Sequence, residues 1–155
     1  TDINLSMIKE GQKKIIDNGI LTPSIACDAE ALPFPSNYFD CVTISFGLRN
    51  MTKKDSALRE IYRTLAPGGK ILILEFSEIY KPLRKLYDLY SFKLVPKLGK
   101  IITKDKESYK YLVESIRMHP NQEQLLDLMK DCGYEKTSFM NLSAGIVAIH
   151  KGFKF

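Results

Sequence analysis

The sequence predicts an α/β fold built on a parallel sheet, and three observations carry this prediction. Residues 40–46 and 70–76 are short runs of branched apolar residues, typical of strands that are covered on both faces. A helical pattern lies between them, so the three segments form a right-handed βαβ unit. Near the end of the chain, residues 134–141 and 146–152 alternate as an antiparallel pair joined by a turn.

Length and composition indicate one domain. The chain has 155 residues and a hydrophobic fraction of 45%, which is ordinary for a globular protein. No apolar run approaches the ~20 residues of a membrane-spanning helix, and residues 1–20 lack the layout of a signal peptide. We therefore expect a soluble or peripheral protein.

The cysteines indicate neither disulfides nor a metal site. Cys27, Cys41 and Cys132 are odd in number, widely spaced and without CxxC spacing. We expect buried free thiols in a reducing compartment, and no bound metal.

The first helix follows an acid. Asn4 or Ser6 is suited to cap a helix that ends near Gly19. Its inner stripe is predicted to be Leu5, Ile8, Ile15 and Ile16. Directly before it, Asp2 stands where nucleotide-binding α/β folds hold ribose hydroxyls, because a carboxylate accepts two hydrogen bonds from a diol. An acid beside a helix N-terminus also serves as a dipole partner, and Asp2 alone does not decide between the two.

A second short strand, residues 24–27, ends at another acid. Asp28 is suited to face an adenine amino group while Ala29 leaves room for the ring; alternatively, Asp28 is a loop acid in water. Pro33 and Pro35 then stiffen the loop and prevent it from continuing the sheet.

The strand at residues 40–46 ends in a short polar loop that contains Arg49 and Asn50. Open α/β sheets bind ligands outside the carboxyl ends of their strands, so any chemistry is expected here. Thr52 and Asp55 resemble a capping box for the next helix, which stops at Ala-Pro-Gly-Gly, residues 66–69. A structural alternative is that Arg49 and Asn50 cap this helix, or that Arg49 pairs with Asp55.

The net charge of +5 is concentrated in residues 80–104, which contain seven basic residues and one acid. We interpret this segment as an amphipathic insertion that covers the ligand edge of the sheet. Its basic and apolar composition suits an anionic membrane surface or a nucleic acid, and suits a solvated helix face equally well.

A helix is predicted at residues 105–118, and Asn121 is suited to cap another that ends at Cys132-Gly133. Between them, His119 is a candidate general base because the pKa of histidine lies near neutrality. Its place before Pro120 at a helix end is equally typical of a structural residue. We expect His150 to be structural.

Four stretches of the sequence carry a family resemblance: DAEALPFPSNYFDCVTISFGLRN, LAPGGKILILEFS, YDLYSF and SYKYLVESIRMHPNQE. Together they resemble the class I S-adenosylmethionine-dependent methyltransferases and, more narrowly, the UbiE-type ubiquinone/menaquinone biosynthesis C-methyltransferase family. LAPGG alone is common to many methyltransferases, so the other stretches carry the specificity. Thr64 and Ala66 are modest departures from the family's signature.

The resemblance implies a Rossmann-like class I methyltransferase sheet that is N-terminally incomplete. Family members carry a preceding part with the first strand and a glycine-rich cofactor loop, so the chain is expected to be a fragment of a longer protein or a truncated relative. The family's first strand lies centrally, so the strands that end near Asp2 and begin at Asp40 are expected to lack a shared partner.

The resemblance also implies site residues. It makes Asp2 a ribose ligand, Asp28 and Ala29 contacts of the adenine edge, and Ser45 a cofactor contact. Arg49 is the candidate to stabilise a phenolate or polarise a water, and Asn50 the candidate to hold a quinol oxygen. Substrate-pocket candidates are Phe46, Tyr87, Tyr90 and His119.

The resemblance implies S-adenosylmethionine-dependent C-methylation of a polyprenyl benzoquinol or demethylmenaquinol. A catalytically incompetent scaffold of a quinone-synthesis assembly is the alternative, and a membrane or nucleic-acid binder driven by charge is a third. The lipid-quinol substrate favours a peripheral membrane surface as partner, with other quinone-biosynthesis proteins as further candidates, and argues against nucleic acid. The expected location is the cytoplasmic side of the inner membrane in a bacterium, or the mitochondrial matrix face in a eukaryote.

Overall fold

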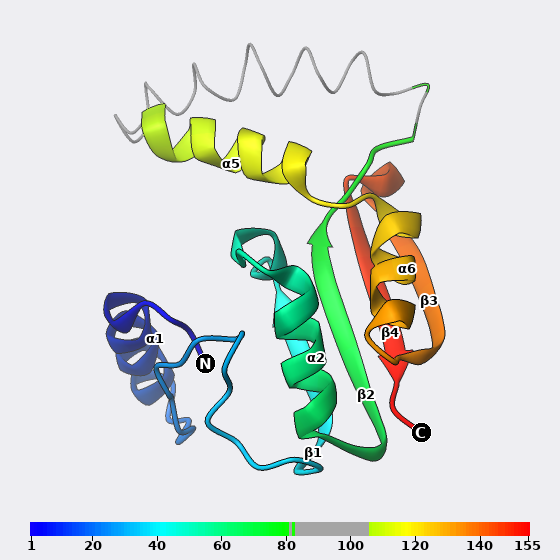
Figure 1. Cartoon of the computed structure of the whole chain (residues 1–155). Helices are drawn as coiled ribbons and strands as arrows, with labels where there is room; N and C mark the ends of the chain where they lie inside the picture. Colours follow the sequence, from blue (N-terminus) through cyan, green and yellow to red (C-terminus); the bar gives the residue numbers. More distant parts are fainter. Residues whose placement is uncertain (81, 83–105) are drawn as a thin grey trace.

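A mixed sheet organises the computed structural model, which describes residues 1–80, 82 and 106–155. Its strand order is β1-β2-β4-β3 (Figure 1), formed by β1 (Phe39–Ser45), β2 (Leu65–Phe76), β4 (Val147–Phe153) and β3 (Glu135–Leu142). β1 and β2 are parallel, whereas β4 pairs antiparallel with both β2 and β3. The predicted α/β fold with a C-terminal antiparallel pair is therefore confirmed.

The helices lie on one side of this sheet or beside it (Figure 1). α2 (Lys54–Thr64) and α6 (Gln122–Asp131) pack side by side on one face. α5 (Lys106–Met118) contacts the short 3₁₀ turn η1 (Leu48–Asn50), and a second such turn, η4 (Ser143–Gly145), joins β3 to β4. The core between helices and sheet contains Leu58, Ile61, Leu65, Ile71, Ile73, Leu125 and Met129.

Two of the predicted helix caps are confirmed. The Asn4 side chain accepts hydrogen bonds from the backbone N–H groups of Ser6 (2.9 Å) and Met7 (3.2 Å) at the start of α1 (Leu5–Asp17). Asn121 and Gln124 form a reciprocal capping box at the start of α6.

The predicted cap of α2 is wrong. The helix begins at Lys54 and has no side-chain cap from Thr52. Instead, the Glu30 carboxylate accepts a hydrogen bond from the Lys53 N–H at 2.8 Å. Because Glu30 lies 23 residues before Lys53, local sequence spacing did not reveal this hydrogen bond.

β2 begins earlier than predicted. It starts at Leu65 and includes the Ala-Pro-Gly-Gly segment. Phe39 pairs with Leu65 and Cys41 pairs with Lys70, so residues 66–69 form an irregularity in the ladder. Gly69 is buried there, and its carbonyl accepts a hydrogen bond from the Lys154 N–H.

The expectation that the strand at residues 40–46 is covered on both faces is wrong. β1 is an edge strand, and its residues Cys41, Thr43 and Ser45 are exposed while Val42 and Ile44 are half-buried. In the described part of the chain, the face of β1 that holds Val42 and Ile44 packs against the core, whereas Cys41, Thr43 and Ser45 on the other face are exposed. The short strand expected at residues 24–27 is reduced to one parallel bridge between Asp2 and Ala26.

α1 also differs from the prediction. None of its residues is buried, and Leu5 and Ile16 are 61% and 63% exposed. The predicted stripe therefore has no cover from the described residues, because α1 lies beside the sheet rather than on it (Figure 1).

The cysteines follow the prediction only in part. All three are free thiols, but Cys132 alone is buried, Cys27 is half-buried and Cys41 is exposed. Cys41 is exposed because it points from the uncovered side of β1.

The insertion predicted at residues 80–104 lies outside the described residues except for Tyr80, which is exposed, and Pro82. Within residues 1–80, 82 and 106–155, every helix is too short or too polar to cross a bilayer.

Two glycines give a test of the packing around β2. A Cβ at Gly69 would lie 2.8 Å from the Ala66 carbonyl oxygen, whereas one at Gly11 in α1 would meet nothing within 4 Å. We expect Gly69→Ala to destabilise the protein by about 1–3 kcal/mol and Gly11→Ala to stabilise it by about 0.5–1 kcal/mol. Urea unfolding of both variants checks this, and equal midpoints would contradict the packing described.

Candidate functional site

A polar hollow of about 390 Å³ lies at the carboxyl end of β1. It is lined by residues from the bridge segment, the turn after it, the end of β1 and η1. Five residues predicted from the sequence are brought together here: Asp2, Asp28, Ala29, Ser45 and Asn50. These residues come together because parallel strands place their carboxyl ends at the same edge of a sheet.

Asp2 and Asp28, two of the three acids that line the polar hollow, keep hydrogen-bonding capacity. Asp2 Oδ1 accepts the Asn4 N–H at 2.8 Å, and Asp28 Oδ1 accepts the Glu30 N–H at 2.9 Å. The second oxygen of each carboxylate has no hydrogen bond from the described residues, and both side chains are exposed. Each acid can therefore accept hydrogen bonds from a hydroxyl or amino group in the hollow.

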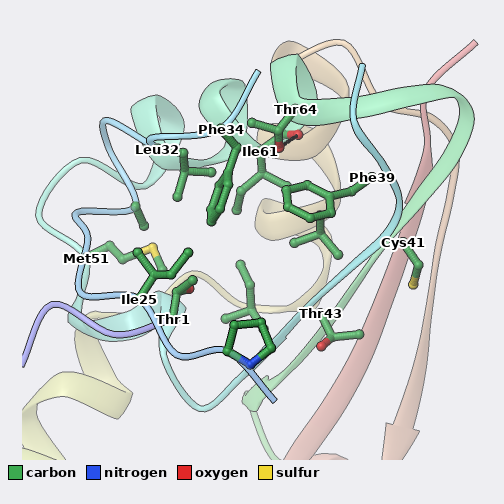
Figure 2. Close-up of a pocket in the computed structure, with 14 residues that line it drawn as sticks. Thr1, Ile25, Leu32, Phe34, Phe39, Cys41, Thr43, Met51, Ile61 and Thr64 are labelled. Atoms are coloured by element: carbon green, nitrogen blue, oxygen red, sulfur yellow. Dashed lines mark hydrogen bonds between the residues drawn. The ribbon is translucent and has the colours of Figure 1, made fainter. Parts of the chain in front are cut away.

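An apolar hollow of about 350 Å³ lies next to the polar one. Figure 2 shows Leu32, Phe34, Phe39 and Ile61 around it, with Ile25 and Met51 at the side of the N-terminal segment. The two hollows share Thr1, Ala29, Thr43, Ile44 and Met51. The site therefore joins a polar end at η1 to an apolar part alongside β1.

Arg49 does not line either hollow. Its Nη1 donates hydrogen bonds to Glu75 Oε1 at 2.9 Å and to the Phe46 carbonyl oxygen, and its backbone N–H donates to Glu75 Oε2 at 3.1 Å. The guanidinium lies over the Phe76 ring, 5.3 Å from the centroid. The suggested pairing of Arg49 with Asp55 is wrong, because Glu75 occupies the guanidinium.

Sequence reasoning missed Glu75, whose side chain is 1% exposed. One signal was present, since Glu75 is a carboxylate that directly follows the apolar residues 71–74 near the end of β2. A buried carboxylate requires a partner, but the sequence does not say which cation supplies it.

Phe46 has an unusual backbone. Its φ of 53° is in the left-handed region, which is rare for an aromatic residue. Its N–H donates to the Leu74 carbonyl at 2.9 Å, and its ring lies 4.9 Å from that of Phe76. Strain of this kind is held by surrounding contacts and is frequent at functional sites.

Asn50 is held from α5. The Tyr111 hydroxyl donates a hydrogen bond to Asn50 Oδ1 at 3.0 Å, which leaves the Asn50 amide group free to donate toward a ligand. Tyr111 is the second residue that sequence reasoning missed, and nothing in its spacing indicated this contact.

His119 lies at the end of α5 and lines neither hollow. It is 8% exposed, and neither ring nitrogen has a hydrogen-bond partner among the described residues. Burial, and then the charges of Lys54, His150 and Arg49, lower its pKa from 6.5 to about 4. His119 is therefore neutral near pH 7.

Of the remaining candidates, the structure describes His150 alone. His150 is buried and its Nε2 lies 3.1 Å from the Gln122 carbonyl oxygen, as expected of a structural residue. Tyr87 and Tyr90 lie outside the described residues. In the described ranges, no three His, Cys, Asp or Glu side chains are arranged to hold a metal ion.

Comparison with known proteins gives matches along the whole chain. The profile of the ubiE/COQ5 methyltransferase family matches residues 1–154. Two similar relatives are ubiquinone/menaquinone biosynthesis C-methyltransferases UbiE from Nitrosospira multiformis (56% identical) and Neisseria meningitidis serogroup A (58% identical). The matches cover all of this chain but only 64% and 63% of those relatives.

A solved structure supports the fold. The S-adenosylmethionine-dependent methyltransferase from Thermotoga maritima, described as a possible histamine N-methyltransferase, matches with a TM-score of 0.68 at 19% identity. The match covers 99% of this chain and 71% of that one. The likeness confirms the predicted Rossmann-like sheet.

The neutral, buried His119 predicts a pH dependence of stability. Its pKa is lower in the folded protein than the ordinary 6.5, so the unfolded chain binds the extra proton as pH falls from 6.5 to about 4. Stability present above pH 6.5 is then lost, by up to about 3 kcal/mol. Urea unfolding between pH 7.5 and 4.5 should show a larger loss in the wild type than in His119→Gln. Equal losses would exclude this contribution.

Proposed function

Since this chain belongs to the ubiE/COQ5 methyltransferase family, we propose that the intact protein methylates a ring carbon of a polyprenyl benzoquinol or of demethylmenaquinol, with S-adenosylmethionine as the methyl donor. The chain spans about 64% of the length of its curated relatives, so the proposal concerns the whole protein. One observation carries it: Asp2, Asp28, Ser45 and Asn50, from four separate segments, line one polar hollow.

The residues of the polar hollow fit the proposed methyl donor. S-adenosylmethionine, when bound, supplies a methyl group on an electrophilic sulfonium. Asp2 is suited to accept hydrogen bonds from the ribose hydroxyls, and Asp28 from the adenine amino group. Ala29 and Gly47 contribute little side-chain volume to the lining, which leaves room for a planar base.

The proposed acceptor needs an ionised oxygen, because a phenolate pushes electron density onto its ortho carbon. Asn50 lines the hollow and has its amide N–H groups available for that oxygen. Arg49 Nη1 is taken by Glu75 and Phe46, and its buried Nε has no partner among the described residues. Nη2, which is not buried and has no hydrogen bond to the described residues, is therefore the Arg49 donor that remains for the phenolate or a water.

The competing proposal is a catalytically incompetent subunit that acts as a scaffold in a quinone-synthesis assembly. It is favoured by the single bridge that joins Asp2 to Ala26, which leaves Asp2 weakly held at the hollow. A protein of this kind would keep the shell of the fold without binding the methyl donor.

We expect the intact protein to bind S-adenosylmethionine at 1:1 stoichiometry by calorimetry and to add one methyl group to a short-chain quinol by mass spectrometry. Asp2→Asn should weaken the affinity about 10- to 100-fold, because it weakens hydrogen bonds to a charged acceptor.

The matched control is Asp17→Asn, which changes an exposed acid at the end of α1 outside the hollow. Its affinity should equal that of the wild type. Absence of methyl-donor binding by the intact wild type would favour the scaffold. Binding without turnover on either quinol class would contradict the proposed acceptor.

We further propose that the protein meets its lipid substrate at an anionic membrane surface, on the cytoplasmic side in a bacterium, through residues 80–104. The seven basic residues of that segment support this proposal. Other quinone-biosynthesis proteins are the proposed neighbours at that surface.

The membrane proposal predicts binding of the intact protein to phosphatidylcholine vesicles only when they contain phosphatidylglycerol, with weaker binding at high salt. Changing Lys93, Lys97 and Lys100 together to Gln should weaken binding about 10- to 100-fold. The control changes Lys9, Lys13 and Lys14 of α1 in the same way and should have little effect. Salt-sensitive binding to duplex DNA without vesicle binding would contradict the proposal.

A further inference from the structure

The Glu75 carboxylate sits beneath the ligand edge of the sheet with all its bonds directed at one loop and the end of its own strand. Oε1 accepts from Arg49 Nη1 (2.9 Å) and from the Phe76 N–H (2.9 Å), and Oε2 accepts from the Arg49 N–H (3.1 Å). Glu75 therefore holds Arg49 at two points, one on the backbone and one on the side chain.

Packing of the core does not require a carboxylate at residue 75. Ile71 and Ile73 are on the same face of β2 and are fully buried in the core without polar groups. Placing a charge two residues further along costs desolvation of both ions, which an apolar residue of similar size avoids. This desolvation penalty is explained if the Arg49–Glu75 pair has a functional role at the site.

The remaining contacts limit the guanidinium to one arrangement. Arg49 Nη1 also donates to the Phe46 carbonyl, and the group lies over the Phe76 ring. Only 12% of the Arg49 side chain is exposed. Nε is buried without a hydrogen bond to the described residues, whereas Nη2 is not buried and has none either, and the next residue, Asn50, lines the polar hollow.

We propose that Glu75 is a positioning residue for methyl transfer: it fixes the orientation of the Arg49 guanidinium and thereby determines which of its donors meet the acceptor oxygen. This inference rests on the proposed function. The ion pair also has no net charge, so Arg49 acts on the oxygen through directed hydrogen bonds rather than as a free cation.

The test is a double-mutant cycle on the intact protein with Glu75→Gln, Arg49→Lys and the double variant. Lysine has an ammonium group in place of the planar guanidinium, so Glu75 cannot determine which of several fixed donors faces the acceptor oxygen. Glu75→Gln should lower kcat about 10- to 100-fold when Arg49 is present, and less than about 3-fold in the Arg49→Lys background. Equal losses in both backgrounds would overturn the inference.

The pH profile gives a second readout. Glu75→Gln leaves Arg49 with an unbalanced positive charge, which favours ionisation of a nearby quinol hydroxyl. The rise of kcat with pH should therefore move to lower pH by about one unit, although the plateau is reduced. A lower plateau with no shift would contradict the neutral pair.

Glu60 provides a matched control. It binds Arg63 through two bonds of 2.9 Å and accepts the Leu32 N–H at 3.1 Å, so it forms a similar carboxylate–arginine–backbone unit away from η1. Glu60→Gln should lower the unfolding midpoint without shifting the pH profile of kcat, because it leaves the Arg49–Glu75 pair intact.

Amide exchange separates failure of this inference from failure of the proposed function. Glutamine offers one carbonyl oxygen, so Glu75→Gln should speed exchange of the Arg49 backbone N–H at least about 10-fold. Exchange there should be unchanged in Glu60→Gln. If the wild type has no turnover, the proposed function fails, and an unchanged Arg49 exchange rate in Glu75→Gln still overturns the positioning of Arg49.

Discussion

The parallel register between β1 and β2 is the constraint on which the site depends. Ser45 pairs with Leu74, so the chain leaves β1 beside the last two residues of β2. Glu75 is then directly below the loop that follows β1, within reach of both the backbone and the side chain of Arg49. A different register would leave the Glu75 carboxylate buried without its cation, at a high cost in free energy.

Two arginine–carboxylate pairs each hold a different loop near the hollows. Arg49 and Glu75 hold η1, whereas Arg63 and Glu60 hold the proline-containing loop that precedes β1. Arg63 donates to the carbonyls of Leu32 and Phe34, and its hydrogen bond to Glu60 holds the pKa of that carboxyl below its usual value. The Arg63–Glu60 pair is more exposed than the Arg49–Glu75 pair, so its charges contribute little to stability. Its main role is to fix the loop through the hydrogen bonds of Arg63 to the loop carbonyls.

Three of the predicted residues meet at one hollow because they lie at the ends of extended segments. Asp2, Asp28 and Ser45 each end an extended segment, and a sheet brings such ends together whatever the loops do. The contacts of Arg49 and Asn50 were not predictable, since their partners Glu75 and Tyr111 lie 26 and 61 residues further along the chain. The unpaired edge of β1 was expected, but the lack of cover by the described residues on one face of β1 and on α1 was not, because apolar composition does not tell which faces find cover.

The sequence by itself determined the order of strands and helices, the caps at Asn4 and Asn121, and the set of polar residues at the carboxyl edge. These follow from local periodicity and from backbone groups that nearby side chains must satisfy. The tertiary structure alone decided that Glu75 is the partner of Arg49, that Glu30 accepts the Lys53 N–H just before α2, and that His119 is buried without hydrogen bonds to the described residues. Each of these depends on groups distant in the chain, whose meeting is set by sheet register and helix packing.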